Sequence, residues 1–142
     1  MPIFILHTLF LFLSVGLTFL WTQNPSLTPY NLQAVGLIIL FYFAGKLVSG
    51  SRNRLAASLD AVIFTILTLF LITTTGGVHS PIFFLLYFLL FALSLLFEPV
   101  QSIILSLLLI ALFGYDLSLN FDNLALINLT TLLLTTPIAM IF

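Results

Sequence analysis

Charged residues are almost absent from this chain of 142 residues: three are basic and four are acidic. Hydrophobic residues make up 62% of the sequence, whereas soluble domains contain about 45–50% apolar and about 25% charged residues. A water-soluble protein needs polar side chains to cover its surface, and this chain has too few of them. The composition argues against a soluble enzyme, a nucleic-acid-binding protein and a disordered segment, and it indicates an integral membrane protein.

The apolar residues form long runs separated by short polar or proline-containing segments. A helix that crosses a bilayer needs about 20 predominantly apolar residues. The runs do not alternate apolar and polar residues as barrel strands do, so the sequence predicts an all-α polytopic transmembrane helical bundle, in a single transmembrane domain over residues 1–142. Its six predicted spans are 2–21, 32–48, 59–75, 82–97, 100–117 and 124–142.

We expect the first run to be retained as a helix, because no Lys or Arg precedes it and no small-residue cleavage site follows it. The basic residues Lys46, Arg52 and Arg54 all flank the connection between the second and third spans. Basic residues collect on the cytoplasmic side of a membrane. This connection, both termini and the break at Glu98 and Pro99 are therefore expected in the cytoplasm, in a multi-pass protein of a cytoplasmic (inner) membrane.

The acidic residues fall at predicted span ends or in loops. Asp60 is expected to begin the third span, where the helix dipole stabilises a carboxylate, and it could pair with Arg52 or Arg54. Asp116 and Asp122 lie near the outer connection of the last two spans and are expected to be solvated. This distribution leaves the bilayer core without formal charge, which disfavours pumps, ion-coupled transporters and membrane enzymes.

The most informative segment is the turn 76–81, expected on the outer side between the third and fourth spans. Its two glycines allow a sharp turn, its histidine could act as a proton sensor, and aromatic residues follow. The segment could hold an amphipathic ring at the membrane surface, or it could be a plain hairpin turn. The candidate ligand-sensing residues are Gly76, Gly77, His79, Ser80, Pro81, Phe84 and Tyr87.

Other polar or small residues lie within the predicted spans. Gly16, Gly36 and Gly45 suit close helix packing. His7 is expected to reach the interface or a backbone carbonyl. The sixth span carries an asparagine and several threonines, and we expect it to face protein rather than lipid. No cluster of catalytic or metal-ligating residues is recognisable, so neither an enzyme nor a metal site is expected.

The turn Gly76-Gly77-x-x-Ser80-Pro81 and the residues after it resemble the membrane sensor region of six-span bacterial sensor histidine kinases, including quinone-responsive ones. The resemblance covers essentially the whole chain, although only the turn is motif-like. It implies a signal-input domain of a two-component system, a homodimer, and a cytoplasmic kinase domain or partner protein.

Two features of this chain differ from that family's pattern. Quinone-responsive members typically carry Asn-Pro-Phe, whereas this chain has Ser80, Pro81 and Ile82. The 142 residues also hold no kinase domain, so kinase activity is not implied.

A second hypothesis is a transport component, such as the substrate-binding membrane subunit of a small-molecule importer. Such subunits also consist of about six helices, but they need polar groups that converge on a pocket. Sparse polarity within the predicted spans favours the sensor hypothesis, although the polar sixth span leaves the importer open.

Overall fold

The computed structural model describes residues 3–49, 54–96 and 99–141, and these residues are helical apart from short connections. Arg52 and Glu98 lie outside the described residues, and the side chain of Arg54 is not described either. The helices are α1 (Ile3–Gln23), α2 (Asn31–Ser49), α3 (Arg54–Thr74), α4 (Leu85–Leu96), α5 (Pro99–Leu119) and α6 (Asn123–Ile141). Two 3-10 turns, η1 (Thr28–Tyr30) and η2 (Gly77–His79), lie in the connections.

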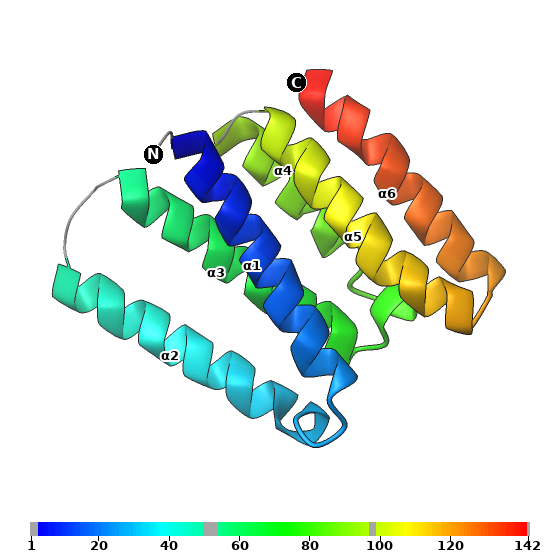
Figure 1. The fold of residues 1–142 in the computed structure, drawn as a ribbon, viewed down its shortest axis with the longest axis horizontal. Helices are drawn as coiled ribbons and strands as arrows, with labels where there is room; N and C mark the ends of the chain where they lie inside the picture. Colours follow the sequence, from blue (N-terminus) through cyan, green and yellow to red (C-terminus); the bar gives the residue numbers. More distant parts are fainter. Residues whose placement is uncertain (1–2, 50–53, 97–98, 142) are drawn as a thin grey trace.

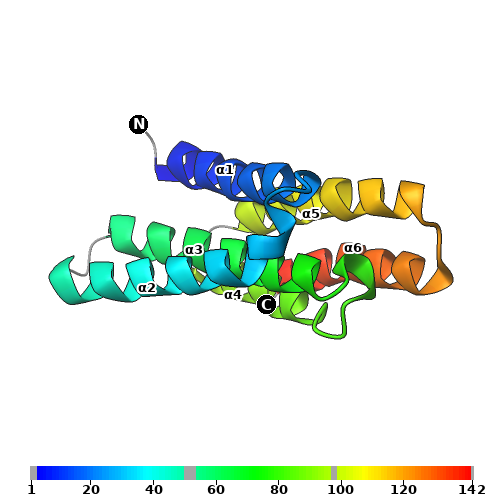
Figure 2. The same ribbon diagram turned by 90° about the horizontal axis from the view of Figure 1, so that it is seen from below.

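The helices lie roughly side by side in two layers (Figures 1 and 2). Figure 2 shows α1 and α5 in one layer, with the remaining helices in the other. Helix α5 packs against α1, α4 and α6, whereas α2 packs at the edge of the bundle against α3. The first turn of α1 and the last turn of α6 lie toward the same end of the bundle, and η1 and η2 lie toward the opposite end (Figure 1).

Four segments are long and apolar enough to cross a membrane: Phe4–Gln23, Thr28–Val48, Pro99–Leu119 and Asn123–Ile141. They correspond to four of the six predicted spans. In the third predicted span, the described residues of α3 include the shorter apolar segment Leu59–Thr74. Helix α4 has only 12 residues, or about 18 Å at 1.5 Å per residue, because the chain still turns between Pro81 and Phe84. The fourth predicted span is therefore shorter as a helix than the sequence indicated.

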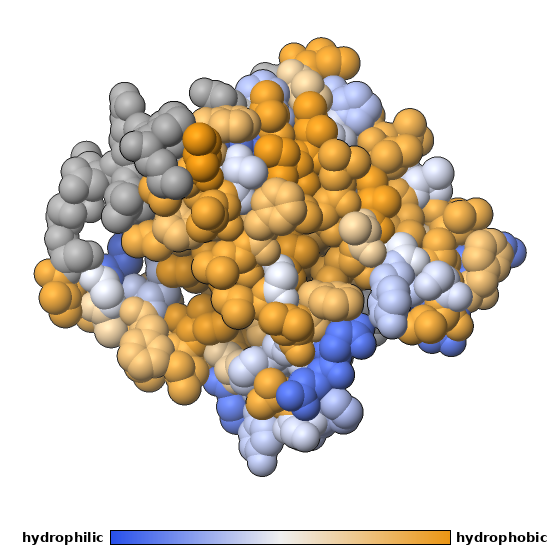
Figure 3. All heavy atoms as spheres, in the orientation of Figure 1, coloured by the Kyte–Doolittle hydropathy of each residue, from blue (hydrophilic) through white to orange (hydrophobic). Residues whose placement is uncertain are grey.

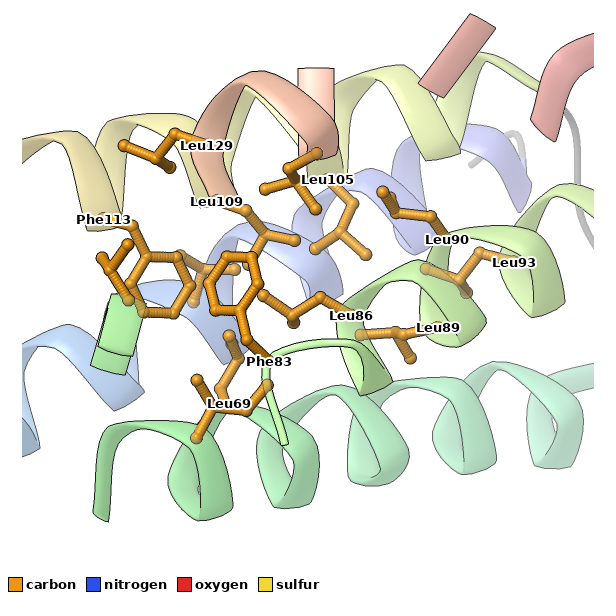
Figure 4. Close-up of a cluster of buried hydrophobic side chains, with 14 of the residues drawn as sticks. Leu69, Phe83, Leu86, Leu89, Leu90, Leu93, Leu105, Leu109, Phe113 and Leu129 are labelled. Carbon is orange, nitrogen blue, oxygen red and sulfur yellow. The ribbon is translucent and has the colours of Figure 1, made fainter. Parts of the chain in front are cut away.

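The core of the bundle is a cluster of buried apolar side chains, mainly leucines, that come from α1, α3, α4, α5, α6 and the connection before α4. Figure 4 shows Leu86, Leu90, Leu105 and Leu109 pointing toward one another from α4 and α5, with Phe83 and Phe113 at one end of the cluster. The four leucines are fully buried. The rings of Phe83 and Phe113 meet edge to face with centroids 5.5 Å apart.

Many hydroxyl groups within the helices donate to the backbone of their own helix. Thr18 donates to the Ser14 carbonyl at 2.9 Å and Thr65 to the Ala61 carbonyl at 2.7 Å. In lipid every polar group needs an internal partner, and such bonds provide one. Among the described residues, no buried side-chain nitrogen or oxygen lacks a hydrogen-bond partner.

The outer surface is mainly apolar, as expected of a chain with so few charges. Figure 3 shows hydrophobic residues over most of one face, with hydrophilic residues gathered mainly at its lower edge, where α1 ends. Large side chains along α2 are strongly exposed, with Leu40, Phe41 and Leu47 at 65%, 66% and 86%. In water such a surface would aggregate, so it supports a membrane-embedded protein.

Two expectations about local structure are wrong. Asp60 does not begin a helix, because α3 begins at Arg54. Instead, its Oδ2 accepts a hydrogen bond from Lys46 Nζ of α2 at 2.8 Å. Among the described residues, no atom of another element lies within 4 Å of the Cβ position of Gly16 or Gly36, so these two glycines do not mediate the close helix packing expected of them.

Candidate functional site

The turn between α3 and α4 depends on its two glycines. Gly76 has φ +121° and Gly77 has φ +61°, conformations that side-chain-bearing residues rarely adopt. These angles allow the His79 amide to donate to the Gly76 carbonyl at 3.1 Å and the Ser80 amide to the Gly77 carbonyl at 3.0 Å. The result is the compact 3-10 turn η2, with Gly77 and Val78 buried.

The carboxylate of Asp116, in the last turn of α5, lies against this turn. A Cβ on Gly77 would be 3.0 Å from Asp116 Oδ2, so the glycine makes room for the carboxylate. Among the residues that the structure describes, the Asp116 carboxylate has no hydrogen-bond or ion-pair partner. An acid in this position is also unfavourable to its own helix, since the C-terminal end of a helix carries partial negative charge.

Asp116 and Gly76 line two clefts on either side of the turn. The larger cleft, which we call the main cleft, has a volume of about 220 Å³ and is formed by the ends of α1, α3 and α5 together with η1 and the start of α2. The smaller cleft, of about 140 Å³, lies between η2, α5 and the start of α6, and His79 lines it.

Polar and aromatic side chains converge on the main cleft. Its aromatic residues are Phe19, Phe113 and Tyr115, and the rings of Phe19 and Tyr115 meet edge to face with centroids 5.9 Å apart. Its polar side chains come from four different elements and from the end of α5: Thr22, Gln23, Thr28, Asn31, Thr73 and Asp116. Asp116 is the only charged residue among those that line this cleft.

The turn is bonded directly to the last helix. Asn128 Nδ2 of α6 donates to the Val78 carbonyl at 2.6 Å. His79 Nε2 lies 3.0 Å from Asp122 Oδ2, just before α6 begins, although both side chains are about half exposed and such a pair contributes little. Farther along α6, Thr136 donates to Ser106 of α5 at 2.5 Å, and the Ala139 carbonyl accepts from Ser94 of α4 at 2.7 Å.

The seven candidate sensing residues do not form one site. Gly76 and Gly77 line the main cleft, and Gly76 and His79 line the smaller one. Ser80 is buried and acts within the turn, since its Oγ lies 2.5 Å from Thr75 Oγ1 and accepts from the Ile82 amide at 3.2 Å.

The residues after the turn are not brought to either cleft. Pro81 is exposed. Phe84 is 47% exposed, and its ring packs against Phe88 with centroids 6.1 Å apart. The Tyr87 ring packs against Phe83 at 6.0 Å. Phe84 and Tyr87, which were expected as candidate sensing residues, do not line the main cleft, and its aromatic residues are Phe19, Phe113 and Tyr115.

At the opposite end of the bundle, His7 is partly buried between α1 and α5. Its Nδ1 is 3.1 Å from Nε2 of Gln101 in α5, and Gln101 is only 2% exposed. A pair of polar side chains joins α1 to α5 here, and the space beside it is about 10 Å³, too small for a ligand.

Sequence reasoning missed the residues that make the main cleft polar. Asp116 was expected to be solvated, and it is exposed, but its place beside the η2 turn was not expected. Thr22, Gln23 and Asn31 belong to the segment 22–31, which was interpreted as the loop after the first span. A usable feature was present: Asp116 follows an apolar run, near the end of a span, where an acid is unfavourable. Which helix ends surround it depends on the packing of α1, α3 and α5, which no local pattern encodes.

Comparisons with known protein families, with curated proteins and with solved structures find no match for this chain. Among the described residues, no group of three or more His, Asp or Glu side chains could hold a metal ion.

Proposed function

We propose that this chain is the signal-input domain of a bacterial membrane sensor, which detects a membrane or envelope ligand beside the η2 turn. The observation that carries the proposal is the bond from Asn128 to the Val78 carbonyl. It ties the turn, which borders both clefts, to α6, the last helix before Phe142. A ligand that displaces η2 therefore acts on α6 directly.

All six helices are placed across the membrane in this proposal, with both termini in the cytoplasm. Lys46 and the other basic residues of the α2–α3 connection mark the cytoplasmic side. The four long apolar segments have sufficient length for spanning. The short helix α4 is accommodated because Gly77, Val78 and Ser80 of the preceding connection are buried against protein, where irregular backbone is tolerated at membrane depth.

Signalling requires two packings of the bundle with different affinity for the ligand. Helix α6 is suited to pass such a change along its length, because its hydrogen bonds to η2, α5 and α4 are spread from one end to the other. Its cytoplasmic end would act on a kinase domain or partner protein, and the chain would work as a homodimer, as the resemblance to sensor kinases implies.

A reporter fusion tests this proposal. The chain is joined after Phe142 to the cytoplasmic half of a sensor kinase that drives a reporter gene. Four fusions are made whose junctions increase in length by one residue at a time, so that they sample one helical turn of about 3.6 residues. We expect Asn128→Leu to change reporter output in at least one register. Thr130→Leu, on the exposed face of the same helix, should not. Unchanged output for Asn128→Leu in every register would contradict the proposal.

The main cleft also favours a second candidate, the substrate-binding membrane subunit of an importer. The expected objection was a lack of converging polar groups, yet six polar side chains line this cleft. An importer subunit would copurify with an energy-coupling partner and would support uptake of a soluble compound into cells. A sensor would bind its ligand without any uptake, so an uptake assay separates the two functions.

A further inference from the structure

The main cleft is rich in hydrogen-bond acceptors. Thr22 donates its hydroxyl proton to the Phe19 carbonyl at 3.0 Å, and Thr28 donates to the Asn24 carbonyl at 3.0 Å. Thr73 likewise donates to the Leu69 carbonyl at 2.8 Å. Because these protons are engaged, the three hydroxyl oxygens retain only acceptor capacity for a ligand. The Asp116 carboxylate, when ionised, is an acceptor as well.

The backbone adds to the negative potential of the cleft. Helices α1, α3 and α5 all end here, and the C-terminal end of a helix carries roughly half a negative charge. Of the helices that line this cleft, only α2 begins there, and its N-terminal end contributes partial positive charge. The Asp116 carboxylate is exposed at the mouth of this cleft, so its charge and the three helix ends together favour a cation over an anion there.

We propose that the main cleft binds a small organic cation, a primary or substituted ammonium group carried on a compact apolar body. The ammonium group pairs with Asp116 and donates to the threonine oxygens. The apolar body lies among Phe19, Phe113 and Tyr115, since aromatic rings attract cations and cover apolar ligand surface. This inference rests on the proposed function only in taking this end of the bundle as the ligand-binding end.

The volume and chemistry of the cleft favour this class over others. Its volume of about 220 Å³ exceeds the roughly 150 Å³ of an engineered cavity that binds benzene, so one ring with a short amine fits. A quinone head group presents carbonyl acceptors, which the threonine oxygens and the Asp116 carboxylate do not satisfy. In the cleft lining only the Gln23 and Asn31 amide groups and the Tyr115 hydroxyl are donors for it. Anions are repelled by Asp116. A divalent cation requires several oxygen ligands of high charge density, and a single carboxylate does not provide them.

The chain contains a built-in reporter of this cleft. Trp21 is the only tryptophan, and its Nε1 donates to Oδ1 of Asn31, a cleft residue, at 2.7 Å. Trp21 emission therefore follows events in the cleft. The purified full chain in phosphatidylcholine nanodiscs is titrated with benzylammonium, with its neutral analogue benzyl alcohol, and with a short-chain benzoquinone, and calorimetry provides a second measure of binding.

We expect saturable binding of benzylammonium, and binding of benzyl alcohol at least tenfold weaker. Asp116→Asn should weaken benzylammonium binding about tenfold or more, which corresponds to about 1.4 kcal/mol. Asp122→Asn removes the same charge at the same end of the bundle but outside the cleft lining, and it should change the affinity less than about twofold.

Three results would overturn the inference: no saturable benzylammonium binding up to about 10 mM, equal affinity for the alcohol or the quinone, or an affinity that Asp116→Asn leaves unchanged. The reporter fusions need no ligand, so they separate the two proposals. If benzylammonium does not bind but Asn128→Leu still changes reporter output, the organic-cation proposal is rejected and the sensor proposal stands. If benzylammonium binds as expected but Asn128→Leu has no effect on output, the sensor proposal alone is rejected.

Discussion

The Asp116 carboxylate lies so close to Gly77 that a Cβ on the glycine would be 3.0 Å from its Oδ2. Two residues 39 positions apart in the sequence therefore depend on each other. The glycine gives the turn its shape and also leaves the space in which the acid borders both clefts. The contact between Gly77 and Asp116 therefore links the conformation of the turn to the position of the negative charge beside it.

Gly77→Ala is expected to destabilise the protein by roughly 1–2 kcal/mol, because a side chain disfavours the left-handed backbone, and the methyl group also meets Asp116. Unfolding in detergent micelles measures the loss. Gly16→Ala is the matched control, since it lies within a helix with open space at its Cβ position, and it should be neutral or slightly stabilising. Equal stability of the two variants would contradict the described turn.

Leu109→Ala tests the core. This leucine is fully buried in α5, whereas Leu107 of the same helix is 60% exposed. Truncation of a buried leucine leaves a cavity that the bundle fills only in part, at a cost of about 2 kcal/mol or more. Leu107→Ala should cost much less, because it removes contacts with lipid rather than with protein. A smaller loss for Leu109→Ala than for Leu107→Ala would show that α5 is rotated from its described orientation.

The hydroxyl pair of Ser106 and Thr136 joins α5 to α6 at 2.5 Å. Interhelical hydrogen bonds in membranes contribute about 0.6 kcal/mol on average and about 1.7 at most. A double-mutant cycle with Ser106→Ala and Thr136→Val, followed by unfolding in micelles, should give a coupling energy in that range. A coupling energy of zero would show that the two hydroxyls do not interact in the membrane protein.

The proposed topology is open to labelling, since the chain has no cysteine. A cysteine introduced at His79 should react with a membrane-impermeant maleimide on intact cells. A cysteine at Leu47, which is 86% exposed near the basic connection, should react only after the membrane is opened. Reaction of position 79 only after opening would reverse the orientation and place the clefts in the cytoplasm.

Most of the helix pattern could be predicted from the sequence. Apolar runs of bilayer length gave the four long segments within a few residues, because length and composition are local properties. The end of α3 and the turn at Gly76 and Gly77 were also predictable, since glycine has a specific conformational role. The start of α3 was placed too late: the polar residues before Leu59 were taken for loop, yet the helix continues back to Arg54.

The candidate site was predictable only in part. The turn was recognised, but the residues expected to form a site with it were those that follow it in the sequence. Phe84 and Tyr87 are near in sequence, whereas Phe19 and Asp116 are near in space. Pairings such as Lys46 with Asp60, or Asn128 with the Val78 carbonyl, depend on which helices pack together. A single sequence of nearly uniform hydrophobicity carries little information about that packing.

The proposed sensor requires that the η2 turn control the position of α6. Spin labels at Ile5 and Met140, both exposed near the ends of α1 and α6, report that position in nanodiscs as a distribution of label-to-label distances. We expect Asn128→Leu, which removes the bond to the Val78 carbonyl, to shift or broaden this distribution, whereas Thr130→Leu should leave it unchanged. Identical distributions for the unaltered chain and Asn128→Leu would contradict the claim.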